Sequence, residues 1–347
     1  MRPRPSRLRF TTSLCALTAL AALTSGSLPA LAQTPPPDAP GANGVPPTDV
    51  TQQVQAPTER AAPEAAAPAT DSTTAAVSAG GQYAAGNSRL YAATGQGKLD
   101  LRRGDNGFGA ALVGNFAETY VAGTYQKSTE NLQGRLRYDR YFTSVFGGFV
   151  QVTGTHDAFQ AITFRLNADP GVKLIVVDAE ATKLWGEAGY DFEFDDNYTD
   201  GNGIEQAGAG GAATDSSGLP YVIEQTDTIH SSRLFAGVRH QFNKEVVLTS
   251  GLEYLQGFGG SGGGTPPVPP GYTASKVDLV AINLTAARLN FDALLAAHIG
   301  GGFALGVGIT AKYNSAPLPG KLNLDSTGTL SLIYAFASPA PEEKTCQ

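Results

Sequence analysis

Polar and apolar side chains alternate with period two along much of this sequence, and this alternation restricts the fold more than any other feature. Successive residues of a β-strand point to opposite faces of the sheet, so the alternation predicts strands with one apolar face. In the clearest segment, Leu136 and Tyr138 alternate with Arg135, Arg137 and Asp139. The sequence therefore predicts an all-β fold.

Twelve segments carry this pattern or are compatible with it, and an even strand number is typical of bacterial single-chain membrane barrels. The predicted strands are 75–86, 88–102, 108–119, 129–142, 145–156, 161–176, 182–196, 227–242, 245–258, 285–299, 303–314 and 323–337. Most are about 10 to 15 residues long, whereas soluble sheets usually have strands of five or six. A tilted membrane strand needs about 9 to 11 residues, so these lengths favour a spanning barrel. Val277 is an alternative start for the tenth strand.

The connections between these strands fall into two classes. Every second connection is short, namely 103–107, 143–144, 177–181, 243–244 and 300–302, and the other set includes the long loops 197–225 and 259–284. Aromatic residues also gather near the strand ends, as membrane-interface girdles require. We therefore expect an antiparallel up-and-down transmembrane β-barrel, with both termini and the short turns in the periplasm.

The two ends of the chain have compositions that do not suit a folded core. Residues 1–32 combine four arginines, an apolar stretch and Ala30-Leu31-Ala32, which predicts a secretory signal peptide. Residues 33–74 are rich in proline and alanine and predict a disordered linker, with a role in binding a partner as an alternative. The barrel is then expected at 75–337 and a C-terminal tail at 338–347.

Charge and cysteine content exclude several functions. The formal net charge is −7, and the predicted signal peptide contains basic residues and no acidic ones, so the mature chain is more acidic still. A nucleic-acid partner is not expected, because polyanions bind to basic faces. The expected partners are outer-membrane lipid, the outer-membrane assembly machinery and small solutes.

Several short motifs are similar to those of a bacterial family of salt-induced outer-membrane proteins. They include Ala85-Gly86-Asn87-Ser88, Arg137-Tyr138-Asp139-Arg140-Tyr141-Phe142, Glu187-Ala188-Gly189-Tyr190 and Tyr313-Asn314-Ser315-Ala316-Pro317. The resemblance covers the predicted barrel, and it implies an outer-membrane barrel without an established biochemical activity. One departure is that the chain continues for eleven residues beyond Phe336, although outer-membrane proteins commonly end on an aromatic residue.

The face opposite the lipid is where a function is expected. By parity, the lumen face carries Lys98, Asp100, Arg102 and Arg165 in addition to a predicted polar network, which consists of Arg135, Arg137, Asp139, Lys183, Glu187, Asp191, Glu193, Arg233, Arg239 and Glu253. These charges either pair and fill the lumen, as in an envelope-structural protein, or line a small pore whose selectivity they set. The sequence predicts no catalytic, cofactor-binding or metal-binding residues. The alternative is a barrel enzyme or surface receptor that acts through loops 197–225 and 259–284.

Overall fold

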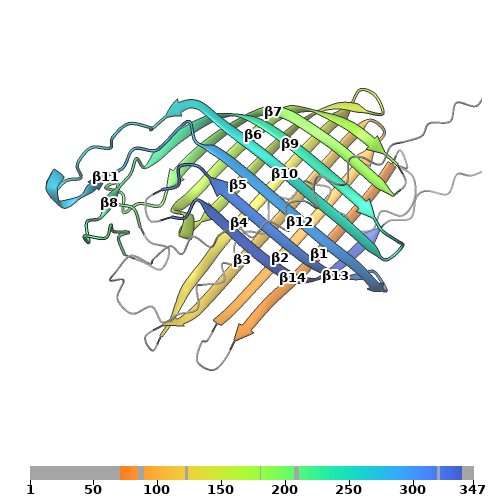
Figure 1. Ribbon diagram of the computed structural model, residues 1–347, viewed down its shortest axis with the longest axis horizontal. Helices are drawn as coiled ribbons and strands as arrows, with labels where there is room; N and C mark the ends of the chain where they lie inside the picture. The colour runs from red at the N-terminus through yellow and green to blue at the C-terminus, as the bar shows by residue number, and fades with distance from the viewer. Residues whose placement is uncertain are drawn as a thin grey trace, which may run out of the picture. The chain divides into compact units, whose positions relative to one another are not determined.

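The computed structural model describes residues 71–84, 90–121, 124–179, 181–206, 211–318 and 321–337. Twelve long strands in these segments form one closed antiparallel barrel, in which each strand pairs with the next long strand along the chain and the last pairs with the first (Figure 1). The predicted signal peptide and C-terminal tail, and most of the predicted linker, lie outside the described residues.

The barrel strands carry the labels of Figure 1. They are β1 (Asp71–Ala84), β2 (Leu90–Arg103), β3 (Asn106–Val121), β4 (Thr124–Tyr141), β5 (Phe146–Asp157), β6 (Ile162–Asp178), β7 (Thr182–Asn197), β9 (Thr226–Gln241), β10 (Val246–Ser261), β12 (Ala287–Gly300), β13 (Phe303–Asn314) and β14 (Leu324–Ala337). Two short strands in the loops, β8 (Tyr221–Val222) and β11 (Asp278–Leu279), pair in parallel. Two 3-10 turns, η2 (Ala158–Gln160) and η3 (Ala274–Lys276), complete the described elements.

The all-β barrel and its twelve strands are confirmed, but several predicted strand boundaries differ from those of the structure. β4, for example, begins at Thr124 rather than at residue 129. β1 begins at Asp71, inside the predicted linker, because residues 71–74 continue the ladder with residues 100–103 of β2. Backbone pairing does not need the apolar side chains on which the sequence prediction depended. The alternative start at Val277 is also wrong, since Asp278 and Leu279 pair with β8 and the barrel strand begins at Ala287.

Alternate residues of each strand face opposite environments. Leu136 is 55% exposed on the outside, whereas its neighbour Arg137 is 2% exposed and faces inward. Large apolar side chains are exposed around the outer surface, among them Leu112, Leu132, Leu136, Val150, Leu174, Leu234, Leu252, Leu295, Val307 and Leu330. Such a continuous apolar belt is typical of a barrel surrounded by lipid. No helix among the described residues is long and apolar enough to cross a membrane.

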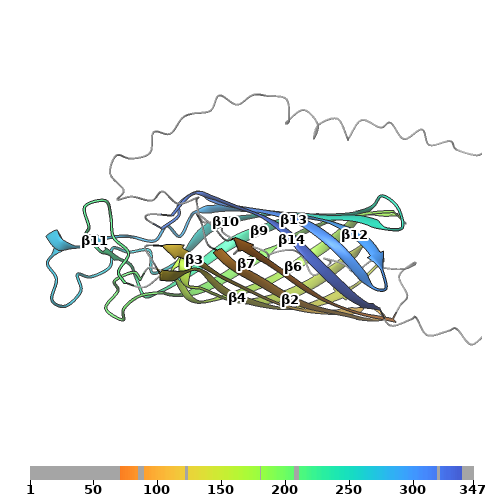
Figure 2. The same ribbon diagram turned by 90° about the horizontal axis from the view of Figure 1, so that it is seen from below.

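The strand connections divide between two ends of the barrel, which we call the short-turn end and the long-loop end. At the short-turn end, the Asn243 side chain accepts hydrogen bonds from the backbone of Glu245 and Val246. Positive φ angles at Gly300, Gly301 and Gly302 form another tight turn there. The loops that contain β8 and β11 project from the opposite end (Figure 2).

Exposed aromatic side chains mark both edges of the apolar belt. Phe142, Phe146, Phe242 and Phe303 lie near the short-turn end, and Tyr91, Tyr125, Phe258 and Tyr313 lie near the long-loop end. Aromatic rings prefer the boundary between hydrocarbon and headgroups, so these positions agree with two interfacial girdles.

The apolar belt predicts how the barrel responds to a charge on its outer face. We expect Leu136→Arg to lower the free energy of unfolding in lipid vesicles by about 2–4 kcal/mol, because the belt offers the guanidinium no water. Phe142→Arg, at the strand end, is the matched control and should cost about 0–1 kcal/mol. Urea unfolding measures both. If both substitutions lowered the free energy of unfolding by the same small amount, the lipid-facing belt would be contradicted.

Candidate functional site

The structure places all ten residues of the predicted polar network on the inner faces of four strands. β4 contributes Arg135, Arg137 and Asp139, β7 contributes Lys183, Glu187, Asp191 and Glu193, β9 contributes Arg233 and Arg239, and β10 contributes Glu253. Within each strand these residues are an even number of positions apart, with no register shift between them. Their side chains therefore point to the same face of the strand. The ten residues nevertheless do not form one cluster.

A central group of side chains crosses the barrel at the level of Glu187. Arg137 donates to both carboxylate oxygens of Glu187, from Nη2 to Oε1 at 2.7 Å and from Nη1 to Oε2 at 3.2 Å. Oε2 also accepts a hydrogen bond from Nη1 of Arg233 at 2.9 Å. Arg137 also donates to Asp139 (2.7 Å), and Arg233 donates to Glu253 (2.6 Å). The result is a chain of alternating charges from β4 to β10.

Arg137 reaches Glu187 across two intervening strands, β5 and β6. The side chains of those strands make this possible, since the guanidinium of Arg137 lies 4.2 Å from the ring centre of Phe149. The Phe149 ring in turn occupies the space beside Gly171, where a Cβ atom would approach it to 2.6 Å. A glycine on β6 thus leaves room for an aromatic ring that supports the arginine through a cation–π contact.

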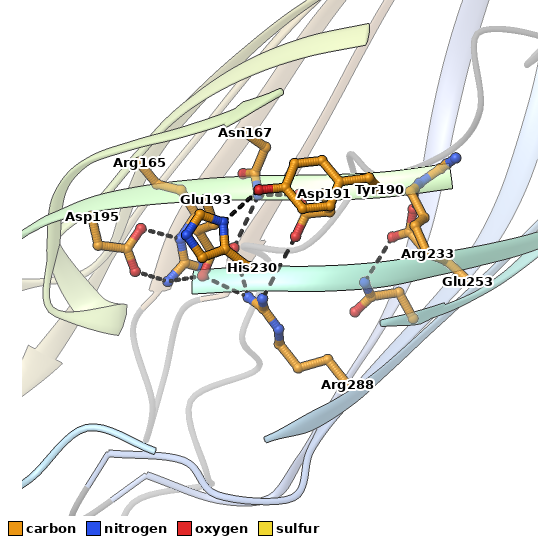
Figure 3. Close-up of polar contacts among 11 residues, drawn as sticks. Arg165, Asn167, Tyr190, Asp191, Glu193, Asp195, His230, Arg233, Glu253 and Arg288 are labelled. Atoms are coloured by element: carbon orange, nitrogen blue, oxygen red, sulfur yellow. Dashed lines mark hydrogen bonds and ion pairs between the residues drawn. The ribbon is translucent and has the colours of Figure 1, made fainter. Parts of the chain in front are cut away.

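A second group lies closer to the long-loop end, where two arginines hold acidic residues of β7 (Figure 3). Arg165 of β6 binds both carboxylate oxygens of Asp195, at 2.6 Å and 2.5 Å. Arg288 of β12 binds Glu193 at 2.7 Å and lies 3.9 Å from Asp191. Asn167 donates to both Asp191 and Glu193.

β7 is therefore an acidic strand whose basic partners come from other strands. Its inward residues Glu187, Asp191, Glu193 and Asp195 are all buried. Their partners Arg137, Arg165, Arg233 and Arg288 lie on four different strands. Because a buried carboxylate without a counter-charge is costly, each arginine stabilises the position of β7 relative to its own strand.

The remaining predicted residues lie outside these two groups. Lys183 is 3.8 Å from Asp178 near the short-turn end. Arg239 lies two residue positions from the same end, and its Nε and Nη2 atoms have no hydrogen-bond partner among the described residues. Arg135 is buried beside a small cavity at mid-height.

The predicted ten-residue network omits four participants in the second group, Arg165, Asn167, Asp195 and Arg288, although parity places Arg165 on the lumen face. Arg165 and Asp195 carried a signal, since both continue the period-two pattern of charged residues on their strands. Arg288, Asn290 and Asp292 also follow a period of two polar positions. Arg288 is the second residue of β12, however, and the sequence offers two alternative starts for this strand. Its partner Glu193 is 95 residues away in sequence, so no local pattern could pair them.

Two cavities show how the network divides the lumen. A cavity of about 430 Å³, which we call the vestibule, lies at the long-loop end and is lined by Arg165, Glu193, Arg288, Lys312 and loop residues. A second cavity of about 40 Å³ lies at mid-height among Arg135, Asp169, Asp191, Arg233 and Glu253. The smaller space accommodates water molecules but not a larger solute. The network therefore narrows the lumen below the vestibule.

The two long loops proposed as an alternative site are joined to each other. β8 belongs to one loop and β11 to the other, and Ile204, Val222 and Val277 form a small apolar cluster beside their ladder. Glu205 is fully buried there, and neither carboxylate oxygen has a hydrogen-bond partner among the described residues. Burial raises the pKa of Glu205, although the charge of Lys321 acts in the opposite direction.

Removal of the shared carboxylate should destabilise the barrel. We expect Glu187→Gln to lower the free energy of unfolding by about 3–5 kcal/mol, because Arg137 and Arg233 lose their common counter-charge. Glu130→Gln is the matched control, since Glu130 pairs with Lys127 on the exposed surface and its loss should be undetectable. Urea unfolding in vesicles measures both variants. An unchanged stability for Glu187→Gln would mean that water already solvates the network.

Several solved structures are similar to this barrel at low sequence identity. Among solved structures, the NanC porin shares 12% identity, with 77% of this chain and 98% of that chain covered and a TM-score of 0.36. The translocator domain of the autotransporter NalP from Neisseria meningitidis shares 12% identity, with coverage of 77% and 88% and a TM-score of 0.36. The toluene transporter TodX from Pseudomonas putida shares 10%, with coverage of 78% and 90% and a TM-score of 0.32. Sequence identities and TM-scores this low do not support an inference about function.

No curated protein matches the chain significantly. The profile of a family described as "Protein of unknown function, DUF481" matches residues 77–265, which is more than half of the chain. The match begins in β1 and ends in the loop after β10, so it covers most of the barrel. The chain therefore belongs to this family of unknown function.

Proposed function

We propose that the protein is an outer-membrane barrel that forms a narrow pore, with the short-turn end and both termini in the periplasm. The apolar belt and the sorting of short turns from long loops support this placement, since bacterial membrane barrels have short periplasmic turns and long external loops. The proposal includes insertion by the outer-membrane assembly machinery. It assigns the barrel no catalytic role.

The pore proposal rests on a difference in side-chain size between the two sides of the lumen. Long charged side chains project from β4, β6, β7, β9, β10 and β12. On the opposite strands many inner residues are small, although β2 also carries the ion pair Lys98–Asp100 and the vestibule end carries Lys312 and Asp325. Examples of these small inner residues are Ser78, Thr94, Gly306, Gly308 and Ser331. Most of the described inner residues of β1, β2 and β14 are half-buried, with Ala92 of β2 as a buried exception, so the lumen beside them is not completely filled. We call this side the small-residue wall.

A pore of this kind selects by charge at its constriction. A solute that passes the central group moves beside Arg137, Glu187, Arg233 and Glu253, which present fixed charges of both signs. Rings of charged side chains set the selectivity of membrane channels. Because acidic and basic groups alternate there, we expect weak selectivity between anions and cations and a small conductance.

An envelope-structural role is the competing proposal, and the same network supports it. Fully paired charges that fill a lumen stabilise a barrel without any transport. A receptor that acts through the joined long loops is a third proposal, supported by the buried Glu205 and by the vestibule beneath those loops. Conductance distinguishes the pore from both alternatives.

Planar lipid bilayers provide the test. We expect small, discrete channel events from the purified barrel and larger events from the double variant Arg233→Ala with Glu253→Ala, because the constriction loses two long side chains. The double variant Lys127→Ala with Glu130→Ala removes an exposed ion pair and should conduct like the parent. A heat-dependent band shift on unboiled gels verifies folding of each variant. Absence of channel events from folded parent and folded variant at every voltage would contradict the pore.

A further inference from the structure

Two pairs of like charges lie at opposite ends of the ladder between β7 and β9. Near the short-turn end, Lys183 is the register partner of Arg239. Near the long-loop end of the same two strands, Asp195 is the register partner of Asp227. All four side chains lie on the inner faces of their strands. Like charges directly opposite each other destabilise a sheet, so stability does not explain why the charges of this ladder are sorted by sign.

Acidic groups exceed basic groups on the inner wall of the long-loop half. Lys321 and the buried Glu205 add one group of each sign in the loops at this end. The two arginines of this wall, Arg165 and Arg288, are already bound to acidic residues of β7 (Figure 3). In the described strands the basic groups are Arg165, Arg288 and Lys312, and the acidic groups are Asp157, Asp191, Glu193, Asp195, Asp227 and Asp325. The vestibule is therefore acidic overall.

The short-turn half has the opposite balance of charge. In the described strands, its inner basic groups are Lys98, Arg102, Lys183 and Arg239, and its acidic groups are Asp100 and, at the rim, Asp178. Asp100 lies 2.8 Å from Lys98, whereas Asp178 is 3.8 Å from Lys183. Basic groups therefore exceed acidic groups here. Between the two halves, the central group carries charges of both signs.

This order of charges has a physical consequence for mobile ions. Fixed charges in a narrow passage with low-dielectric walls concentrate ions of the opposite sign. The long-loop half then concentrates cations, and the short-turn half concentrates anions. A voltage that is positive on the long-loop side drives both kinds of ion from their own half towards the central group, so the ion density there rises. The opposite voltage draws both kinds away from the central group, which then conducts less.

We propose that the lumen is polarised by charge along its axis, with a cation-selective half at the long loops, an anion-selective half at the short turns and a conductance that depends on the sign of the voltage. Asp227 and Arg239 are the specificity-determining residues, because each is the member of its like-charged pair that makes no ion pair among the described residues. The voltage dependence rests on the proposed pore. The charge polarity does not, since it is measurable without ion flow.

Charge reversal at Arg239 tests the short-turn half. In Arg239→Glu the new carboxylate lies opposite Lys183, so a pair of like charges is replaced by a pair of opposite charges and the variant should fold. Lys244→Glu is the matched control, because it changes the net charge by the same amount at the same end. Lys244 is exposed in the turn between β9 and β10, outside the lumen. The heat-dependent band shift verifies folding of each variant.

The polarity is measured with two methanethiosulfonate reagents of similar size, one carrying a trimethylammonium group and the other a sulfonate. Single thiols are introduced by Ile229→Cys and by Gln241→Cys, in a background where the native Cys15 and Cys346 are replaced by serine. Ile229 and Gln241 are both half-buried on the inner face of β9, one near each end of the strand. The two thiols therefore report on the two halves of the lumen.

We expect the ratio of cationic to anionic reaction rates to be about tenfold higher at position 229 than at position 241. Arg239→Glu should raise the ratio at position 241, and Lys244→Glu should leave it unchanged. Equal ratios at the two positions would overturn the proposal. A thiol at either position that reacts with neither reagent would also overturn it, because that half of the lumen would then admit no ions.

Single-channel currents in planar bilayers test the voltage dependence. The chamber from which the sulfonate reagent modifies the thiol at position 241 faster identifies the short-turn side of each channel. We expect a larger parent current when the long-loop side is positive, loss of this asymmetry in Arg239→Glu and the parent asymmetry in Lys244→Glu. Symmetric currents from a conducting parent would overturn the proposal. Absence of any current would contradict the pore instead, and the ratios of the thiol reactions would then decide the polarity by themselves.

Discussion

A backbone N–H or C=O group inside a lipid bilayer has no water to bind, so each strand that crosses the hydrocarbon must bond to a neighbour on both sides. In this barrel the requirement is met by closing twelve strands on themselves, with β14 returning to β1. Closure also sorts the side chains, because one face of every strand then meets lipid and the other meets the lumen. The apolar belt and the buried charges are both consequences of that sorting.

Within the closed wall, the charges are distributed unevenly. The acidic residues of β7 draw arginines from β4, β6, β9 and β12 into the lumen, and these side chains fill one side of it. The opposite side, around β1, β2, β13 and β14, carries more small residues, together with the ion pair Lys98–Asp100. The long charged side chains therefore narrow the lumen from one side of the barrel.

The sequence predicts the fold well because the alternation is local. Leu136 and Arg137 are neighbours, and their opposite environments follow from strand geometry alone. The start of β1 at Asp71 was missed because residues 71–74 are held by backbone pairing, which leaves no hydrophobic pattern. The site is predicted less completely. Parity identifies inward charges, but the pairing of Arg288 with Glu193 depends on the curvature of the closed barrel. The burial of Glu205 depends on how two loops join, which no strand pattern encodes.

The division between a lipid-facing and a lumen-facing side is the central claim, and tryptophan fluorescence tests it at two adjacent positions. Trp185 is the single tryptophan of the chain and is replaced by phenylalanine as the background. In that background, Leu234→Trp places the indole on the outer face and Phe235→Trp places it on the inner face, one residue further along β9. In vesicles whose acyl chains carry bromine, we predict strong quenching for Trp at position 234 and weak quenching at position 235. Equal quenching at the two positions would contradict the claim.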